Sequence, residues 1–321
     1  MRISYCRTLL ASLLLAASFT STARAATDFP NRSVRIVVGF APGGTTDILA
    51  RVMAEKLNEY WRVPVIVENR PGADGIIATT FVHQAPPDGY TLLMSTNALV
   101  ITPHLKKLPY DPLYDFAPIT IVGREYHHMM VTPGLPAKTV KEFVDLAKAA
   151  PAGLTFSSAG PGSAPFLGMQ RFIQATGIPN MVHVPYPGSM PAALGLVTGE
   201  VHAMFSSPST TLELARDGKV RLLAVAGPTR DPNAPEAPTI VEAGFPGFES
   251  NTWFALLTSS KVPADVLEKI STDIGRAMRD PGIRKRIVDM NSSPVGNSPE
   301  EFRQVIKDDF ATFGRVIANI K

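Results

Sequence analysis

The stretch that most constrains the fold of this chain runs from Val34 to Tyr60. Residues 34–40 are mostly apolar and β-branched, residues 41–47 read Ala-Pro-Gly-Gly-Thr-Thr-Asp, and residues 48–60 place apolar side chains at helical spacing. This order predicts a buried strand, a glycine loop and a helix that a residue of Thr45–Asp47 can cap.

Such a unit has a chemical consequence at its loop. Backbone N–H groups and the positive end of the helix dipole would point at one place, and that place favours an anion. We therefore expect the loop from Ala41 to Asp47 to hold a carboxylate. An ordinary strand–helix turn has the same signature, so the motif alone leaves both interpretations open.

A second unit of the same design lies further along the chain. Leu154–Ser158 is typical of a strand, Ala159–Pro165 is rich in glycine and proline, and Phe166–Thr176 has helical spacing. Strands and helices alternate through much of the sequence, which predicts an α/β fold with mostly parallel sheets. Two such loops that face each other from two domains would form a cleft.

The N-terminal residues have the pattern of a secretory signal peptide. Arg2 and Arg7 precede the apolar run Leu9–Ala17, and Ala23-Arg24-Ala25 supplies small residues at a cleavage site. The apolar run is too short to span a bilayer. We expect cleavage after Ala25 and a periplasmic location.

Charge and cysteine content exclude several classes of protein. The whole chain carries a formal net charge of +3, and removal of Arg2, Arg7 and Arg24 brings it to 3 − 3 = 0. Nothing in that balance indicates binding to nucleic acid or to an anionic membrane. The single cysteine, Cys6, leaves with the signal peptide, so the mature chain has no disulfide. Its size favours two domains.

Motifs along the whole mature chain resemble those of Bug-family proteins, the periplasmic solute-binding components of tripartite tricarboxylate transporters. The matching stretches are Val34–Asp47, Val67–Ala73, Asp88–Leu93, Lys107–Pro112, His183–Tyr186, Gly199–Val201, Gly218–Arg221, Pro238–Gly244 and Ser298–Phe302. Their order and their spread make the resemblance far more specific than any single glycine motif.

The resemblance implies an α/β, two-domain periplasmic binding protein fold of type II, a flytrap with two crossover strands. The expected boundaries are 1–25 for the signal peptide, 26–125 and 251–321 for the first domain, and 126–250 for the second. The ligand implied is a small carboxylate, such as a di- or tricarboxylate or an aromatic acid, held by the loops Ala41–Asp47 and Ser157–Ser163. No cofactor and no metal are implied.

The expected ligand-binding residues lie on these loops and on neighbouring turns. They are Pro42, Gly43, Gly44, Thr45, Thr46, Asp47, Thr96, Asn97, Ser157, Ser158, Gly160, Ser163, Tyr186 and His202.

Two positions depart from the usual family pattern. His202 follows Gly199-Glu200-Val201 where relatives usually have Asp. If it faces the cleft, it would favour an additional ligand carboxylate and disfavour a ligand amine; otherwise it is a hydrogen-bonded wall residue. At the first crossing, Arg124 could grip a carboxylate and Tyr126 or His127 could stack on a ring, unless this segment is a solvated hinge surface.

The sequence contains few motifs that indicate a function other than solute binding. An exported enzyme is the main alternative, but the chain has neither a Gly-x-Ser-x-Gly elbow nor a His-Glu-x-x-His motif. His127 and His128 are adjacent, so they would make poor joint metal ligands on a strand. We expect the protein to be a monomer and its partners to be the membrane subunits of the transporter. A sensor kinase ectodomain is the alternative partner, and the sequence does not decide between them.

Overall fold

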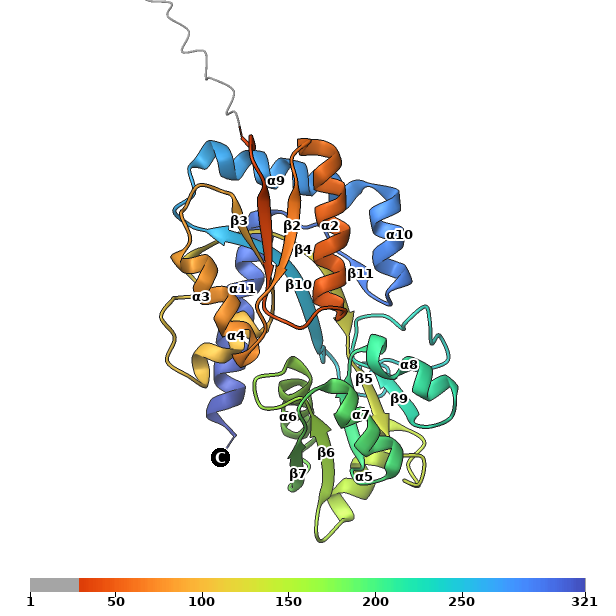
Figure 1. Ribbon diagram of the computed structural model, residues 1–321. Coiled ribbons are helices and arrows are strands. Elements are labelled where there is room, and N and C mark those ends of the chain that lie inside the picture. Colours follow the sequence, from red (N-terminus) through yellow and green to blue (C-terminus); the bar gives the residue numbers. More distant parts are fainter. Residues whose placement is uncertain (1–28, 321) are drawn as a thin grey trace, which may run out of the picture.

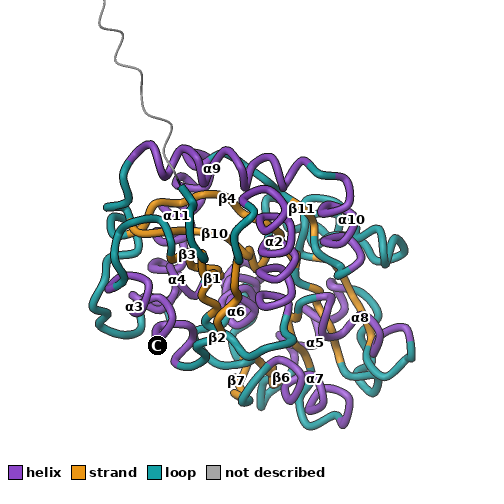
Figure 2. Tube along the Cα trace, turned by 45° about the horizontal axis from the view of Figure 1, so that its top comes forward, coloured by secondary structure: helices purple, strands orange, loops and turns teal. Residues whose placement is uncertain are grey.

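The computed structural model describes residues 29–320, so the predicted signal peptide and its cleavage site lie outside the described residues. The chain forms two lobes, each built on one β-sheet with helices on both faces (Figure 1). Figure 2 shows the strands of the two sheets as separate groups. Among residues 29–320, no helix has the length and apolar character to cross a membrane.

The first lobe contains a six-stranded sheet of order β11-β4-β10-β3-β1-β2. Its strands are β1 (Val34–Val38), β2 (Val65–Asn69), β3 (Thr91–Thr96), β4 (Phe116–Tyr126), β10 (Asn251–Ser259) and β11 (Ser293–Pro294). Its helices are α2 (Thr45–Trp61), α3 (Ile76–Gln84), α4 (Ala98–Ile101), α9 (Ala264–Arg279), α10 (Pro281–Asp289) and α11 (Pro299–Ala318), with 3₁₀ turns η2 (Ala73–Gly75) and η3 (Thr102–His104).

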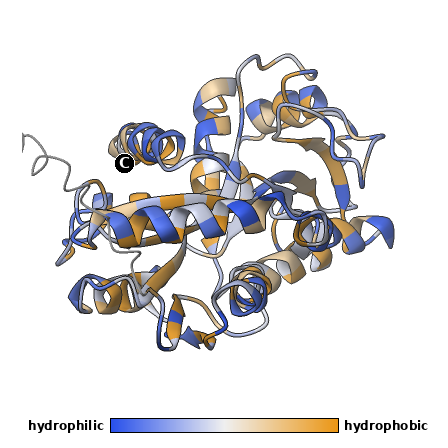
Figure 3. Cartoon of the chain, turned by 90° about the horizontal axis from the view of Figure 1, so that it is seen from above, coloured by the Kyte–Doolittle hydropathy of each residue, from blue (hydrophilic) through white to orange (hydrophobic). Residues whose placement is uncertain are grey.

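The helices of this lobe cover opposite faces because the strand residues alternate. Val38 of β1 belongs to the apolar cluster that contains residues of α2, α9 and α10, whereas Val37 belongs to the cluster that contains residues of α3, α4 and α11. The helices are amphipathic, as the mixture of hydrophilic and hydrophobic residues along them in Figure 3 illustrates. In α9, for example, Ile270, Ile274 and Met278 are buried at helical spacing.

The second lobe contains a five-stranded sheet of order β7-β6-β8-β5-β9. Its strands are β5 (His128–Val131), β6 (Leu154–Ser158), β7 (Met181–Pro185), β8 (Ala203–Ser206) and β9 (Arg221–Val225). Its helices are α5 (Val140–Ala149), α6 (Ala164–Thr176), α7 (Ser189–Thr198) and α8 (Pro208–Arg216).

The chain passes between the lobes twice. It leaves the first sheet at Tyr126, enters the second at His128, and returns at Asn251 with β10 (Figure 1). The last helix, α11, lies against β4 of the first lobe and also contacts α6 of the second. The two lobes therefore meet along both crossing segments and one helix.

The prediction of mostly parallel sheets is correct for only part of each sheet. Strands β2, β1 and β3 are parallel, as are β7, β6 and β8. In contrast, β10 is antiparallel to β3 and β4, and β5 is antiparallel to β8 and β9. The reason is the crossing: β10 starts at the junction between the lobes, where β3 and β4 end, so it runs the other way.

Two local predictions need correction. The helix that follows the first glycine loop is not capped by Thr45–Asp47; its N-cap is Gly44, without a side-chain hydrogen bond. Residues 105–118 are rich in Pro, Tyr and Asp, which predicts an irregular connection over the whole range. In the structure this connection ends earlier, because Phe116 and Ala117 pair with the far end of β10 and extend β4. In the second unit, Ser163 does cap its helix, with its hydroxyl accepting the N–H of Phe166.

Candidate functional site

The candidate site lies where the parallel strands of both lobes end. β1 and β3 end in the loops before α2 and α4, and β6 and β8 end in the loops before α6 and α8 (Figure 1). The loop after β6 approaches the turn that follows β2 in the other lobe: a methyl group added to Gly162 would lie 2.9 Å from a carboxylate oxygen of Asp74 in η2. The carboxyl ends of parallel strands are where open α/β sheets bind ligands.

The first loop is braced by a carboxylate. Asp47 is buried, and its oxygens accept the N–H of Gly43 at 2.9 Å, two hydrogen bonds from Arg51 at 2.9 and 3.0 Å, and the amide of Asn69 at 2.9 Å. Burial acts to raise the pKa of Asp47, but the hydrogen bonds from Arg51, Gly43 and Asn69 outweigh it and hold the pKa below its usual value. Asp47 shapes the loop, because its acceptor sites are occupied within the chain.

The outer part of the first loop is open. Pro42, Gly43 and Gly44 are exposed, and Gly43 has a positive φ of 84°. The first N–H groups of a helix have no partner within it, and α2 has no side-chain cap to satisfy them. The loop therefore presents donors and a helix dipole at an accessible surface.

The second loop satisfies most of its polar groups internally. The hydroxyl of Ser158 accepts the N–H of Gly160 at 3.1 Å and lies 2.8 Å from Nε2 of His183. Ser163 donates to the carbonyl of Gly160 at 2.7 Å and caps α6, and the buried Ser157 donates to the carbonyl of Ala192 at 3.0 Å.

The loop after β3 is anchored beneath the junction. Asn97 is buried; its carbonyl oxygen accepts the N–H of Trp253 at 2.8 Å, and its amide donates to Asp309 of α11 at 3.3 Å. The hydroxyl of Thr96 accepts the N–H of Ala98 at 3.3 Å. The Asn97 side chain thus fixes the loop to β10 and α11, and the Thr96 hydroxyl stabilises the loop itself.

One residue predicted to contact ligand lies away from the junction. His202 precedes β8 at the end remote from the junction, where its Nδ1 lies 3.0 Å from the N–H and 2.8 Å from the hydroxyl of Thr155. Thr155 is three residues before the last residue of β6, about 10 Å along the strand. Tyr186, in contrast, follows β7 at the junction end, where its N–H donates to the carbonyl of Ser158 at 3.0 Å and its ring lies over Gly195 of α7. The condition on which the His202 hypothesis depended, a side chain facing the cleft, is therefore not met.

The first crossing is also different from what was expected. His127 is fully buried between the hydroxyls of Ser250 at 2.8 Å and Thr252 at 3.0 Å, and burial, with a smaller effect of His128, lowers its pKa to about 3. His128 turns the other way, and its Nε2 lies 2.9 Å from Asp231.

Tyr126 packs beside Gly227 in the second lobe. Arg124 has a buried Nε without a hydrogen-bond partner, and together with Tyr126 it lines a small hollow of about 180 Å³ on the flank of the junction. His127 therefore has no ring face free to stack on a ligand, whereas Tyr126 is partly exposed at this hollow.

One residue at the junction was missed. Glu125 is the residue before Tyr126 and is only 1% exposed. Its carboxylate accepts hydrogen bonds from Ser209 of α8 at 3.2 Å and from Ser292 at 3.0 Å, so it joins the two lobes. Burial raises its pKa, although hydrogen bonds from Ser207, Ser292, Ser209 and Thr45 partly oppose this. An acidic residue after the apolar run 116–123 was the available signal.

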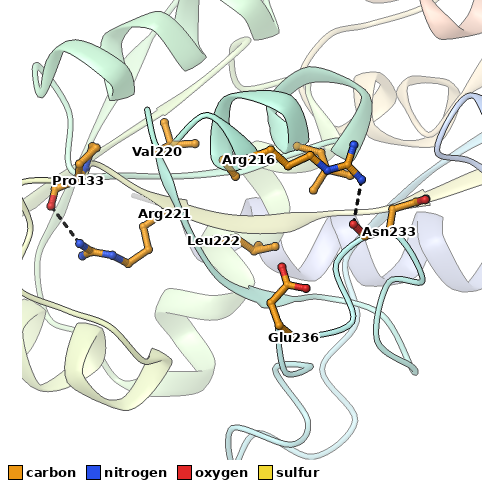
Figure 4. A pocket seen from close by; sticks show the side chains of 10 residues that line it. Pro133, Arg216, Val220, Arg221, Leu222, Asn233 and Glu236 are labelled. Carbon is orange, nitrogen blue, oxygen red and sulfur yellow. Dashed lines mark hydrogen bonds between the residues drawn. The ribbon is translucent and has the colours of Figure 1, made fainter.

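Another pocket lies on the outer surface of the second lobe (Figure 4). It measures about 390 Å³, and its arginines already have partners: Arg216 donates to the carbonyl of Asn233, and Arg221 donates to that of Pro133. We do not assign a ligand to it. Within residues 29–320, no group of three or more His, Cys, Asp or Glu side chains could hold a metal ion.

Comparison with known proteins gives the family. A family model described as "Tripartite tricarboxylate transporter family receptor" matches residues 49–321. The protein BugT of Bordetella pertussis is 31% identical over 90% of this chain and 89% of its own length. An R. palustris protein solved with adipate is 31% identical, with a TM-score of 0.80 over 90% of this chain and 97% of that chain.

A further solved structure, MatC from Rhodopseudomonas palustris with bound malate, is 29% identical, with a TM-score of 0.76 over 90% of this chain and all of that chain. These neighbours share the two-domain α/β fold of periplasmic binding proteins, which confirms the fold predicted from the sequence. The family consists of periplasmic solute-binding receptors and not of enzymes. The chain belongs to the receptor family of the tripartite tricarboxylate transporters.

Proposed function

We propose that this protein captures a small organic carboxylate between its two lobes and delivers it to the membrane subunits of a tripartite tricarboxylate-type transporter. The observation that carries the proposal is the first loop. It is exposed at Pro42–Gly44, presents the uncapped N-terminus of α2, and lies at the end of the first lobe that is toward the second (Figure 1). Relatives solved with adipate and malate support a carboxylate as ligand.

The two lobes contribute different groups to the proposed binding site. Backbone N–H groups of Gly44, Thr45 and Thr46 hold the carboxylate, and Asp47 keeps the loop in shape. Ser158, Gly160 and Thr96 close the cleft from the other sides. Closure requires that the ligand contact both lobes, because only a difference in contacts between the open and closed forms can shift the equilibrium.

The choice among carboxylates is not made by His202, whose side chain is bound to Thr155. Di- and tricarboxylates and aromatic acids are therefore all candidate ligands. Presentation of the ligand to a sensor kinase ectodomain is the alternative use of the same cleft. Deletion of the transporter's membrane genes separates the two, because it abolishes uptake but leaves a sensing response intact.

A substitution at Gly44 tests the proposed cleft. The backbone of Gly44 has a φ of −78°, which any residue adopts, and an added methyl group would meet only the carbonyl of Ala41 at 3.7 Å. Gly44→Leu should therefore fold normally but cover the loop N–H groups. We expect loss of affinity of about 100-fold or more for every carboxylate ligand, because close backbone approach is blocked.

The measurement is a thermal-shift screen of the mature protein with di- and tricarboxylates, aromatic acids and amino acids, followed by calorimetry, since a ligand of the folded state raises the midpoint. Gly134→Leu is the matched control: Gly134 is exposed, has free space around it, and lies after the end of β5 remote from the junction. Normal binding by Gly44→Leu would refute the assignment of the first loop.

A further inference from the structure

A groove between the lobes, away from the loops of the proposed cleft, is lined by two arginines. It measures about 760 Å³ and lies where α6 of the second lobe meets the C-terminal part of α11 of the first (Figure 1). We call it the arginine groove, and the lining residues that matter here are Arg171, Gln174, Phe245, Phe248, Arg315 and Asn319. Its volume is within the range of small-molecule sites. Arg171 lies about 10 Å along α6 from the start of that helix at the junction, so the groove is separate from the cleft.

Arg171 is half-buried and uses few of its donors. Its Nη1 donates to the backbone carbonyl of Glu249 at 2.8 Å, and its guanidinium lies 5.5 Å from the ring centroid of Phe248. Within residues 29–320 it forms no other hydrogen bond and no ion pair. Because a guanidinium has five N–H donors in a planar fork, most of its capacity to bind a carboxylate is unused.

The second arginine reaches the groove from the other lobe. Arg315 is exposed, and its one hydrogen bond in the described part of the chain is a long one, 3.4 Å to the hydroxyl of Thr312. Burial lowers the pKa of Arg171, and the positive charge of Arg315 adds to this effect. Asp309 and Glu249 act in the opposite direction, but neither forms an ion pair with Arg171. No Asp or Glu of residues 29–320 lines the groove, so an anion between the two arginines would relieve their repulsion.

The helix ends beside the groove offset this charge only in part. The helices α6 and α11 end at Thr176 and Ala318, close in sequence to the residues that line the groove. A helix C-terminus carries about half a negative charge, whereas each arginine carries a full positive charge. The sum of these charges is about +1, so the groove still favours an anion.

The apolar part of the lining is held in place by aromatic contacts. The rings of Phe245 and Phe248 each lie edge-on to that of Phe172, with centroids 5.7 and 5.8 Å away. The turn that carries them contains Gly244 and Gly247 with φ of 104° and 72°, which side chains of L-residues rarely allow. The groove therefore offers a fixed apolar surface next to two cations, as a ligand with an apolar body and an anionic group requires.

We propose that the arginine groove is a second binding site for a small organic anion with an apolar body, such as an aromatic carboxylate, held by Arg171 of one lobe and Arg315 of the other. The two guanidinium groups bind the anionic group, and Phe245 and Phe248 contact the apolar body. Since the arginines belong to different lobes, the bound anion joins the lobes outside the cleft. The site does not depend on what the cleft binds.

The test uses 2-naphthoate as the probe and 2-naphthamide as its neutral analogue of similar shape. Calorimetry is carried out at about pH 7.5, where the carboxylate is ionised. The protein is Gly44→Leu, in which the side chain covers the first loop of the proposed cleft and leaves the groove unchanged. We expect a stoichiometry of about one and a dissociation constant below about 1 mM for naphthoate, with binding of naphthamide about tenfold weaker or less favourable still.

Arginine variants in the same background locate the site. Arg315→Gln and Arg171→Gln should each weaken naphthoate binding about tenfold, and change naphthamide binding by about threefold or less. Arg315 makes little contribution to the fold, so its variant remains informative even if loss of the bond to Glu249 destabilises Arg171→Gln. Arg303→Gln makes the same change on α11 outside the groove and should bind naphthoate like its parent. Thermal midpoints verify that each variant is folded.

The outcomes separate this site from the cleft. Loss of naphthoate affinity in the two groove variants, but not in Arg303→Gln, would support the inference, also if the first loop still binds acids in Gly44→Leu. Naphthoate affinity that both groove variants leave unchanged would overturn it, whatever the cleft binds. Equal affinity for naphthoate and naphthamide, or no naphthoate binding to the folded protein, would overturn it as well.

Discussion

The two strand–loop–helix units are alike in sequence but use their polar groups differently. In the first, the helix starts at an uncapped Gly44, and the brace is Asp47, which lies inside the helix and leaves the outer loop exposed. In the second, Ser158 and Ser163 bond within the loop, and Ser163 caps the helix. Equal glycine content therefore does not mean equal capacity to bind an anion.

The difference indicates which loop supplies binding energy. An anion gains most from N–H donors that have no partner in the free protein, because binding then satisfies them at little cost. The first loop has such donors at the start of α2. The second loop has already satisfied much of its own hydrogen bonding, so we expect it to act chiefly as the wall that closes over the ligand.

Removal of Asp47, whose hydrogen bonds hold the first loop in shape, should have the largest effect. In Asp47→Ala, Gly43, Arg51 and Asn69 lose their common acceptor, and the loss of a buried, charge-assisted set of bonds should cost about 3 kcal/mol of unfolding free energy. Ligand affinity should fall by about tenfold or more, because the loop donors are no longer held in place. Urea unfolding and calorimetry measure the two effects.

The matched control for this variant is Asp145→Ala. Asp145 forms an exposed pair with Lys141 four residues earlier on α5, with its side chain 61% exposed, and its removal should cost about 0.5 kcal/mol or less. Wild-type affinity in Asp47→Ala would contradict the role of Asp47 as the brace of the binding loop.

The corresponding change in the second loop should be smaller. Ser163→Ala removes the cap of α6 and should cost about 1 kcal/mol of stability, with affinity changed by about threefold or less. Ser298→Ala removes the capping box of α11 and provides a cap of the same type outside the cleft, with a similar loss of stability and no change of affinity. A tenfold loss of affinity in Ser163→Ala alone would remove the contrast between the loops.

Much of the fold could be predicted because its signals are local. The strand Leu154–Ser158 has the bounds that its residue pattern indicated, and the helix predicted after its loop ends at Thr176 as expected. Strand direction could not be read in this way. Whether β10 runs parallel or antiparallel to β3 depends on the lobe from which the chain arrives, which is a property of the whole topology.

Of the candidate site, the sequence indicates only those parts whose backbone shape requires particular residues. The glycines of the first loop are recognisable because they shape a turn. The places of His202 and Glu125 are not, since they depend on which end of β8 faces the junction and on which helices start beside β4. An acidic residue within an apolar strand was a visible anomaly, but its partners Ser209 and Ser292 are 84 and 167 residues away in sequence.

The smallest expected effect is a dependence of local stability on pH, and it should differ between the two loops. His183 supports the second loop through Ser158, and its ring is tilted against those of Phe156 and Phe166, with ring centroids 4.9 and 4.5 Å away. Burial lowers the pKa of His183 below its usual value of 6.5, so the folded state favours the neutral ring. Below about pH 6.5 the unfolded chain takes up the proton first, and the stability that His183 contributes declines as the pH falls toward its folded-state pKa.

The first loop should not respond in this range, because the pKa of Asp47 is lowered from 3.8 and its bonds fail only in stronger acid. Between about pH 7 and pH 5, hydrogen exchange corrected for the intrinsic rate should show the Gly160 amide losing protection while the Gly43 amide keeps it. In His183→Gln the Gly160 amide should become independent of pH. Equal loss of protection at both amides would mean that the two loops open together in one transition. That result would contradict a separate response of the second loop.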